Sequence, residues 1–330
     1  MDTRQEYWRP IRRLLHSLGI SKGPAGTVPV SGKSQQDLPT ASLPPGESTW
    51  PTGSEDFAAQ PSAWKQRYRV IRSLGGGGMG YTVLAVRLSD SMPVCLKFYS
   101  GKADLRGAEQ ECRALMRLRH RSIVSLIDFS LSDVPPWLAM EYAKGSTLSE
   151  VLEKGGALSP TMAKEIVKQV LQALKYSHSE GVIHRDLKPS NLIVSEDREL
   201  VEIRVLDFGI AIVDRYDARG VLTGGGVDLV GTLNSMAPEQ IEGKILNEKC
   251  DLYALGVMAW EMLTGESPYA HCVSVPQLLL EKAHATHGLK FDQPPPGAPA
   301  GLMMLVEWCT HPDPAKRPSA SEALNLLSAD

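Results

Sequence analysis

The chain has 330 residues, of which 42% are hydrophobic, and its formal net charge is -3. This length suits one large domain or two ordinary ones, and the apolar content excludes disorder of the whole chain. So small a charge does not indicate nucleic acid or an anionic membrane as the main partner. The sequence shows no apolar run that would span a bilayer, no secretory signal and no CxxC pair among its five cysteines, so we expect a cytoplasmic protein with reduced thiols.

The first 62 residues differ in composition from the rest. From Ser21 to Ser62 the chain is rich in Pro, Gly, Ser and Thr, and such a segment buries too little apolar surface to offset its ordering entropy. We therefore expect residues 1–62 to form a flexible tail. Within it, Glu6–Leu18 has the spacing of a short amphipathic helix. Two interpretations stay open: a helix that docks on a partner or a membrane surface, and one that forms weakly or packs on its own domain.

A β-rich region is predicted from Trp64 to about residue 142. The runs YRVIRSL and YTVLAVRL flank the glycines of Gly75–Gly80, which predicts a strand, a glycine turn and a second strand. VCLKFY predicts a third strand, and IVSLIDFSL and WLAMEY predict two more. Between them, Arg106–Leu118 has the apolar spacing of a helix.

After Ser159 the pattern becomes mostly helical, with Ser159 as a candidate N-cap and Pro160 at the first helical position. MAKEIVKQVLQALKYSHS, CDLYALGVMAWEMLTG and LMMLVEWC all show helical apolar periodicity. The prediction is a bilobal α+β domain over residues 64–330. A small β-rich lobe covers about residues 64–142 and a larger helical lobe about residues 146–330.

Several motifs meet the needs of phosphoryl transfer from ATP, which depends on positioning and charge neutralisation. Gly75–Gly80 contains G-x-G-x-x-G, whose glycines let a backbone approach phosphate oxygens. Alone this motif also fits a hairpin without a ligand, and the strand after it argues against a Rossmann site. Lys97 on the next strand is placed to reach the phosphates, and Glu111 on the following helix is placed to pair with it. A single Lys on a strand or a single Glu on a helix is, however, more often a surface residue that only contacts solvent.

The string IHRDLKPSN is dense in groups with catalytic chemistry. Asp186 is suited to accept or orient the proton of a substrate hydroxyl, and Lys188 to neutralise the transferring phosphoryl group. Asn191 and Asp207, the second in the run VLDFG, offer an amide and a carboxylate oxygen to magnesium. The string Ala237–Glu239 closes the long loop that begins at Asp207.

Because these motifs occur in this order, the chain from about Tyr68 to Leu327 resembles the eukaryotic-type protein kinase family. GGMG, HRDLKPSN and MAPEQ are most similar to bacterial serine/threonine kinases. The resemblance implies a kinase fold and an ATP- and Mg²⁺-dependent enzyme that phosphorylates serine or threonine in protein substrates, itself included. A pseudokinase scaffold and a kinase-fold phosphotransferase for a small molecule remain as alternatives. The presence of Lys97, Asp186 and Asp207 argues against the first, and Lys188 with the APE string against the second.

The resemblance also implies roles for individual residues. Lys97 contacts the α- and β-phosphates and is held by Glu111, while Asp186 is the catalytic base and Lys188 is typical of serine/threonine kinases. Asn191 and Asp207 bind the metal. The nucleotide site comprises Gly75, Gly77, Gly80, Thr82, Cys95, Lys97, Met140, Glu141, Ala143 and Ile193.

In that site Met140 is the gatekeeper, and the backbone of Glu141 and Ala143 bonds the adenine edge. Thr82 and Cys95 stand where the family usually has valine and alanine. Both are close in size to the usual residue, so we expect ATP binding to survive.

Further positions follow from the same resemblance. Thr232 touches the catalytic Asp and Lys, Asp251 braces the catalytic loop and Arg317 pairs with Glu239. The regulatory stack is matched by Leu115, Leu126, His184 and Phe208. Leu233 and Ser235 replace a frequent proline and a frequent tyrosine, which puts contacts with a peptide substrate in doubt.

Two interpretations of single residues stay open. Arg185 is typical of kinases whose activation loop is ordered by phosphorylation, and Thr223 is the candidate site, but an unmodified loop threonine fits equally well. His284 and His287 suggest a metal site, although lone histidines on a surface helix or loop are far more often solvated.

Overall fold

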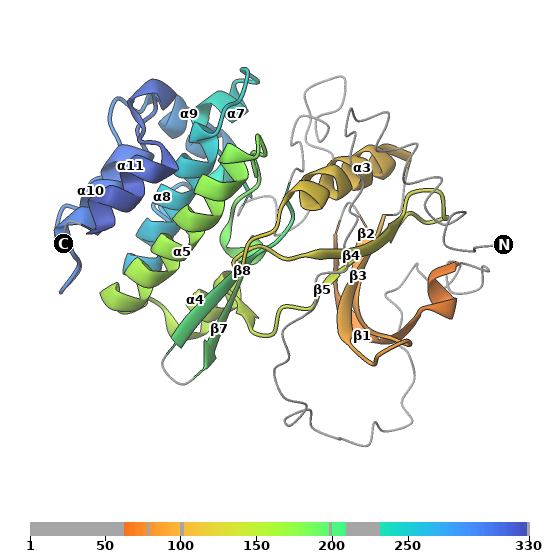
Figure 1. Cartoon of the computed structure of the whole chain (residues 1–330). Helices are drawn as coiled ribbons and strands as arrows, with labels where there is room; N and C mark the ends of the chain where they lie inside the picture. The colour runs from red at the N-terminus through yellow and green to blue at the C-terminus, as the bar shows by residue number, and fades with distance from the viewer. Residues whose placement is uncertain (1–62, 78–79, 100–101, 198–199, 209–231, 329–330) are drawn as a thin grey trace. The chain divides into compact units, whose positions relative to one another are not determined.

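The structure, a computed structural model, describes residues 63–77, 80–99, 102–197, 200–208 and 232–328 (Figure 1). The predicted tail over residues 1–62, its Glu6–Leu18 helix and Thr223 lie outside these ranges. The described residues all belong to one compact unit. In this unit the strands of the larger sheet come first and most of the helices follow, which confirms the predicted α+β order of the two regions.

Five antiparallel strands form the N-terminal sheet, in the order β1-β2-β3-β5-β4. The 3-10 helix η1 (Ala63–Gln66) precedes them. The elements of this region are β1 (Tyr68–Gly77), β2 (Gly80–Arg87), β3 (Pro93–Tyr99), the helix α3 (Lys102–Arg117), β4 (Leu126–Ser130) and β5 (Trp137–Glu141). All five strands and the helix were predicted, but β4 begins three residues later than its apolar run. The reason is tertiary, since Ile123 instead forms a parallel bridge with Val205 from the helical region.

Buried residues alternate along β2 and β3, as they do in a strand that packs one face on a core. One face carries an aromatic cluster that includes Trp64, Tyr81, Phe98 and Trp137. The side chains between the buried positions, on the opposite face of the same strands, are the ones that the nucleotide-site prediction named.

The two strands continue further into the glycine cluster than the sequence predicted. β1 continues through Gly77, and its last residues pair with the start of β2 in the register Gly75–Thr82, Gly76–Tyr81 and Gly77–Gly80. Gly80 has a φ of 138°, and a Cβ there would lie 1.8 Å from the carbonyl oxygen of Phe98. Only glycine at this position lets β2 approach β3 this closely, so Gly80 serves strand pairing as well as any turn.

The helical region starts with a small sheet of β6 (Ser146–Thr147), β7 (Leu192–Asp197) and β8 (Leu200–Val205), in that order. The other elements of this region are α4 (Leu148–Gly155), α5 (Pro160–Ser179), η2 (Pro189–Asn191), α7 (Pro238–Ile241), α8 (Lys249–Thr264), α9 (Val275–His284), α10 (Ala300–Cys309), η4 (Pro314–Lys316) and α11 (Ala320–Ser328). Ser159 accepts a hydrogen bond from the amide of Met162, and Pro160 is the first residue of α5, so the predicted helix start is confirmed.

α8 is the buried centre of this region, with α5 and α10 packed against it (Figure 1). Its side chains are apolar on nearly every face, which is typical of a helix enclosed by its neighbours. A Cβ at Gly256 would lie 2.7 Å from Thr310 Cγ2 and 2.9 Å from Cys309 Cβ, so this glycine lets the end of α10 approach the helix. Of the helices in the described ranges, none has the length and apolar character that crossing a membrane requires.

Glu261 is a mostly buried carboxyl group on α8 that should make stability depend on pH. Burial raises its pKa to about 7, with the charge of Lys282 opposing the rise, whereas the ordinary value is 4.5. The folded chain therefore keeps a proton that the unfolded chain releases, so this contribution to stability is complete below pH 4.5 and is lost as the pH rises toward 7. We expect the loss to reach on the order of 3 kcal/mol.

The test compares wild type and Glu261→Gln by urea unfolding between about pH 5 and pH 8. The variant should show a flatter fall of the unfolding free energy with pH. An identical pH slope in both proteins would show that Glu261 is not the source of the effect.

Candidate active site

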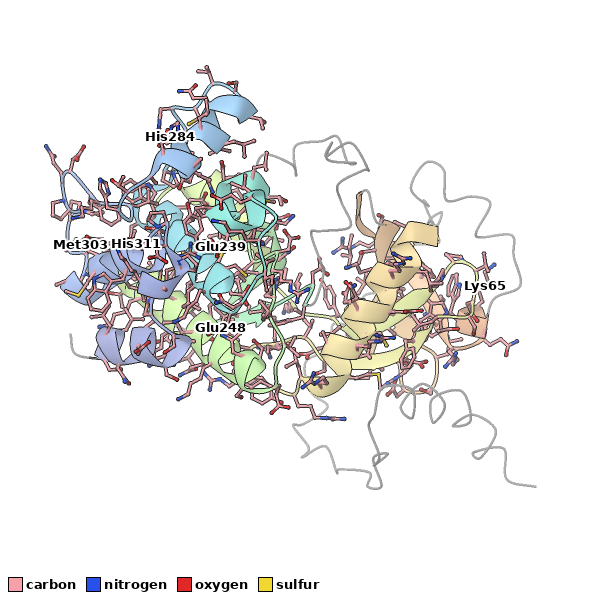
Figure 2. All side chains as sticks on the ribbon, turned by 90° about the horizontal axis from the view of Figure 1, so that it is seen from above. Lys65, Glu239, Glu248, His284, Met303 and His311 are labelled. Carbon is pink, nitrogen blue, oxygen red and sulfur yellow. The ribbon has the colours of Figure 1, made fainter. Side chains whose placement is uncertain are left out.

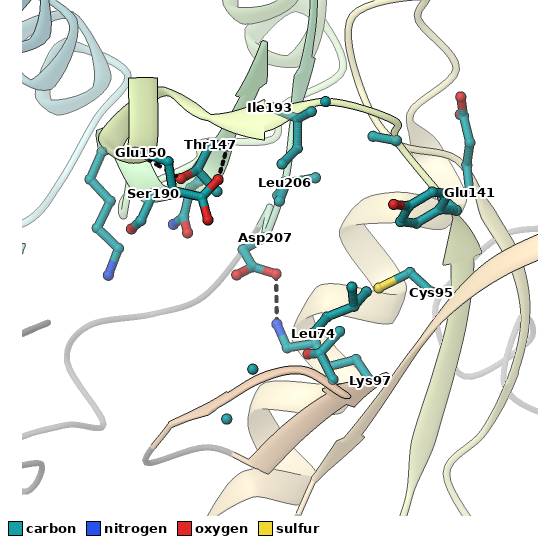
Figure 3. Close-up of a pocket in the computed structure, with 18 of the residues that line it drawn as sticks. Leu74, Cys95, Lys97, Glu141, Thr147, Glu150, Ser190, Ile193, Leu206 and Asp207 are labelled. Carbon is teal, nitrogen blue, oxygen red and sulfur yellow. Dashed lines mark hydrogen bonds and ion pairs between the residues drawn. The ribbon is translucent and has the colours of Figure 1, made fainter. Parts of the chain in front are cut away.

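A cleft of about 440 Å³ lies against the face of the N-terminal sheet opposite the aromatic cluster. Figure 3 shows it with side chains from β1 and β3 facing side chains from β7, from the segment before β7 and from the segment after β8. The residues of the predicted site that line it are Gly75, Gly80, Thr82, Cys95, Lys97, Glu141, Ala143, Asp186, Lys188, Asn191, Ile193 and Asp207. Residues from far apart in the sequence therefore share one cleft.

Three predicted residues lie elsewhere. Met140 is buried in β5, where it pairs with Cys95 of β3 and Leu126 of β4, and it is not part of the cleft lining. Glu111 is fully buried on α3, behind Lys97. Gly77 ends β1 and pairs with Gly80.

Alternation along the strands explains why Thr82, Cys95 and Lys97 all face the cleft. Tyr81 and Val83 are buried in the aromatic cluster, so Thr82 between them points the other way. Thr82 lies opposite Lys97 in the pairing of β2 with β3. The sheet thus presents a hydroxyl, a thiol and an ammonium group on one surface.

Lys97 bridges two carboxylates from different parts of the chain. Its Nζ lies 2.8 Å from Glu111 Oε2 on α3 and 2.7 Å from Asp207 Oδ1 after β8 (Figure 3 shows the second contact). Burial by itself lowers the pKa of Lys97, but the charges of Asp207 and Glu111 outweigh burial and hold the pKa above its ordinary value. Lys97 is therefore a permanent cation that faces the cleft.

The two carboxylates respond in opposite directions. Burial raises the pKa of Glu111, and Lys97 only partly offsets this rise. For Asp207 burial also favours the neutral form, but the charge and hydrogen bond of Lys97 outweigh it and lower the pKa. Asp207 thus stays ionised at the cleft, where its side chain is 29% exposed.

Asp186 lies in a buried network at the other side of the cleft. Asn191 Nδ2 donates to the Asp186 backbone carbonyl at 2.8 Å, and Lys188 Nζ lies 3.5 Å from Asp186 Oδ2. Lys188 also donates to Thr232 Oγ1 at 2.9 Å. The contact of Thr232 with the catalytic loop, which the resemblance implied, is therefore present.

Asp251 on α8 holds the backbone of the loop that carries Asp186. One carboxylate oxygen accepts from the His184 amide at 2.9 Å and the other from the Arg185 amide at 2.8 Å. The same carboxylate contacts His178 Nε2 at 2.8 Å. Burial would raise the pKa of Asp251, yet the hydrogen bond with His178 and the nearby donors lower it, so the group remains an acceptor for both amides.

His184 orients the two catalytic segments against each other. Its Nε2 donates to the Leu206 carbonyl at 2.8 Å, and its Nδ1 accepts from the Asp186 amide at 3.3 Å, which requires the Nε2–H tautomer. The imidazole also packs on the fully buried Phe208, with ring centroids 4.6 Å apart. The stack expected at His184 and Phe208 is therefore in place.

Backbone strain is concentrated at this site. Among the described residues, only three other than glycine have a positive φ, and two of them are Arg185 at 68° and Asp207 at 56°. Such conformations cost on the order of 1–3 kcal/mol each and persist only where the surroundings fix them. Here the surroundings include the Asp251 carboxylate, which holds Arg185, and the Lys97 ammonium, which holds Asp207.

Glu239 and Arg317 form a buried, bidentate ion pair among the packed side chains of the helical region (Figure 2 labels Glu239). Nη1 of Arg317 lies 2.6 Å from Oε1 and Nη2 lies 2.8 Å from Oε2. The guanidinium also donates to the carbonyls of His311, Lys249 and Pro312. This pair was expected from the resemblance.

Sequence reasoning missed several residues of the site. Tyr99 donates to Glu111 Oε2 at 2.6 Å, and its position two residues after Lys97 on the same strand was a usable signal. Thr147 and Glu150 line the cleft and form a capping box at the start of α4, a pattern visible in the letters TLSE. Leu74 in β1 and Leu206 just after β8 also line the cleft, but single leucines at such positions carry no signal of this kind.

The donor set around Asp207 and Asn191 fits a hard cation. Asn191 uses its amide nitrogen toward Asp186, which leaves the amide oxygen as the group for another partner, and Asp207 uses one carboxylate oxygen toward Lys97. Oxygen ligands of this type are the ones that Mg²⁺ prefers. Elsewhere in the described residues, a cluster with metal-ligating side chains consists of His271, Cys272 and Glu281, and it does not include His284 or His287.

Comparison with known proteins gives the same picture. The serine/threonine-protein kinase pkn3 of Myxococcus xanthus is 35% identical over 286 residues, which cover 82% of this chain and 50% of the relative. PrkC of Bacillus subtilis is 32% identical over 208 residues, 62% of this chain and 31% of the relative. PknB of Mycolicibacterium smegmatis is 33% identical over 220 residues, 63% of this chain and 34% of the relative. The chain thus spans half the length of pkn3 and about a third of the other two.

The profile of the family described as protein kinase domain matches residues 68–326. That range begins at the first residue of β1 and ends inside α11, so it includes every element that contributes to the cleft. The chain therefore belongs to the protein kinase family.

Proposed function

We propose that this chain is an active protein serine/threonine kinase that transfers the γ-phosphoryl group of ATP to hydroxyl groups of proteins, itself included. The observation that carries the proposal is the convergence of Lys97, Asp186 and Asp207 on one cleft. A pseudokinase scaffold would need none of the three in these positions. The chain's relatives pkn3, PrkC and PknB are each named serine/threonine-protein kinases, which supports the same assignment.

In the proposed reaction the oxygen of a substrate hydroxyl attacks the γ-phosphorus, and the bond from that phosphorus to the β–γ bridging oxygen breaks with its electron pair leaving on ADP. The carboxylate of Asp186 accepts the hydroxyl proton. Lys188, 3.5 Å from that carboxylate, provides positive charge beside the transferring group. Lys97 provides a second cation for the phosphates of ATP, and Glu111 fixes its position.

Asn191 and Asp207 are the residues that we propose for Mg²⁺. The bound cation would neutralise charge on the phosphates. The phosphates of ATP must compete for the Lys97 ammonium with two carboxylates, Glu111 and Asp207, that already lie within 2.8 Å of it. We expect the ammonium to keep Glu111 and to exchange its contact with Asp207 for phosphate, because Glu111 is buried and Asp207 is partly exposed.

Two regulatory and cellular features belong to the proposal as well. Arg185 Nε is buried and has no hydrogen-bond partner within the described ranges, which leaves it available to a phosphate on the activation loop, with Thr223 as the candidate site of phosphorylation.

A cytoplasmic location is supported by the free thiols of all five cysteines. A docking partner for residues 1–62 remains a prediction.

The decisive experiment incubates the full chain with γ-labelled ATP and magnesium, with and without casein. We expect label on serine or threonine of the chain itself, and its loss by roughly a hundredfold or more in Asp186→Ala. The control variant is Ser179→Ala, because Ser179 is exposed and lies outside the catalytic site. Ser235→Ala would not serve as a control, because Ser235 lies beside the loop that carries Asp186. Equal labelling in wild type and Asp186→Ala would overturn the proposal, and label that appears only on an added sugar or aminoglycoside would favour a small-molecule phosphotransferase.

A further inference from the structure

Lys282 is a buried amine that none of the expected kinase roles explains. It lies on α9, the helix that ends at the labelled His284 in Figure 2, and its exposed fraction is 1%. Lysine is rarely buried unless it is paired, because its ammonium group is strongly hydrated. Within the described residues no carboxylate lies at ion-pair distance from Lys282, although the charge of Glu261 on α8 acts on it from further away. The groups in direct contact with the amine are of another kind.

Two backbone carbonyls and two aromatic rings surround the amine. Nζ donates to the carbonyl of Asn234 at 2.6 Å and to that of Met236 at 2.7 Å. The same atom lies 5.0 Å from the ring centroid of Tyr253 and 4.5 Å from that of Tyr269. A neutral amine still has two N–H groups, so both carbonyls can be satisfied whether or not Lys282 carries its charge.

The carbonyls belong to a segment that we name the acceptor segment, residues 232–237. Its first residue, Thr232, accepts the hydrogen bond from Lys188, which lies beside Asp186. Its last residue, Ala237, donates to the side chain of Gln240, which in turn donates to the Arg185 carbonyl. Both ends of the segment are thus tied to the catalytic loop.

The middle of the acceptor segment is held differently. Its apolar side chains Leu233 and Met236 pack with Leu278 of α9 in one buried cluster. The peptide planes after Asn234 and Met236 are oriented by the amine from α9. Hydrophobic packing fixes where this backbone lies but not how its carbonyls point, whereas two hydrogen bonds to one amine fix both.

A stack of charged and aromatic groups supports the amine in turn. The hydroxyls of Tyr253 and Tyr269 lie 2.6 Å apart, and Tyr253 carries Arg317 at 4.9 Å from its ring centroid. Arg317 is the partner of Glu239, just after the acceptor segment. The segment is therefore braced from α9 by an amine whose own position is set by α8 and by the ion pair.

We propose that Lys282 is a positioning residue for the protein substrate: by holding the carbonyls of Asn234 and Met236 it keeps the acceptor segment in the shape that presents a substrate hydroxyl to Asp186. This inference rests on the proposed kinase function and deepens it. Lys282 itself need not touch the substrate or ATP, since it lies behind the segment. Its removal should therefore weaken binding of the protein substrate and leave the ATP site as it was.

The test measures steady-state kinetics of the full chain with casein as the phosphate acceptor. For Lys282→Met we expect KM for casein to rise about tenfold to a hundredfold, because two buried carbonyls lose their donor. KM for ATP, and the slow hydrolysis of ATP without casein, should stay within about twofold. Lys282→Arg, which keeps N–H donors, should retain most of the casein affinity, and Lys290→Met, whose side chain is 56% exposed, is the matched control.

A purely structural role predicts another result: less folded protein and a lower melting temperature, but an unchanged KM for casein in the fraction that folds. That outcome, or an equal rise of both KM values, would overturn the inference. Should Lys282→Met fail to fold, Tyr269→Leu removes one ring from the amine and must raise KM for casein selectively. If wild type is active and these variants keep its KM for casein, this inference alone is wrong. If wild type phosphorylates neither itself nor casein, the kinase function on which the inference rests is wrong as well.

Discussion

Replacing Lys97 with methionine should lower phosphoryl transfer by about a hundredfold to a thousandfold while the protein stays folded. Methionine keeps the length of the side chain and removes its charge. Without the ammonium, the described residues of β3 that line the cleft bring no positive charge to the phosphates of ATP. The loss should appear mainly in kcat, because Lys97 interacts with the phosphate charge that is redistributed during the transfer step.

The fold should survive this change because Glu111 has another way to lose its charge. Its pKa is already raised by burial, and without Lys97 the carboxyl group can take up a proton and keep its bond from Tyr99. Circular dichroism and the melting temperature check this point beside the labelled-ATP assay. Lys175→Met, an exposed lysine on α5, is the matched control and should keep wild-type activity. A Lys97→Met enzyme with a normal rate would exclude Lys97 from the mechanism.

Replacing Arg317 with methionine should cause the largest loss of stability, about 3–5 kcal/mol. Arg317 is 2% exposed and Glu239 is 5% exposed, so the variant leaves a carboxylate buried without its cation. The carbonyls of His311, Lys249 and Pro312 lose their donor as well. A change of this size corresponds to roughly 6–20 °C in melting temperature for a domain of this size.

Thermal unfolding of Arg317→Met with and without a second change, Glu239→Met, separates the cost of the unpaired carboxylate from the cost of the carbonyls that lose their donor. The double variant should recover part of the loss, because it removes the unpaired charge together with its partner. Arg113→Met is the matched control: its pair with Glu109 is exposed and 3.7 Å long, so it should cost about 0.5 kcal/mol or less. If Arg317→Met melted within 2 °C of wild type, the buried pair would not carry the stability assigned to it here.

Local patterns in the sequence were sufficient for the secondary structure where periodicity and caps agree. The alternation in YTVLAVRL and VCLKFY predicts β2 and β3, and Ser159 with Pro160 predicts the start of α5. The same reasoning was weaker where a contact from another region decides the outcome. The glycines up to Gly77 pair as a strand, and Ile123 pairs with Val205 instead of extending β4.

For the site, residue chemistry and motif order named most of the cleft but not its supports. Lys97, Asp186 and Asp207 stand out because an ammonium and two acids in this order match one chemistry. Tyr99, which bonds Glu111, and Lys282, which holds the acceptor segment, have side chains that occur throughout any protein. Their roles depend on which atoms lie next to them after folding, and the spacing of residues along the sequence does not predict those contacts.

The sequence by itself determined the family, the order of strands and helices, and the chemical identity of the groups at the cleft, because these depend on residue type and on short-range periodicity. Only the tertiary structure decided that Met140 is buried and does not line the cleft, that the buried Lys282 amine bonds the carbonyls of Asn234 and Met236, and that the backbone is strained at Arg185 and Asp207. The physical reason is that burial, hydrogen-bond partners and backbone strain are properties of neighbours in space, and those neighbours are separated by tens of residues along the chain.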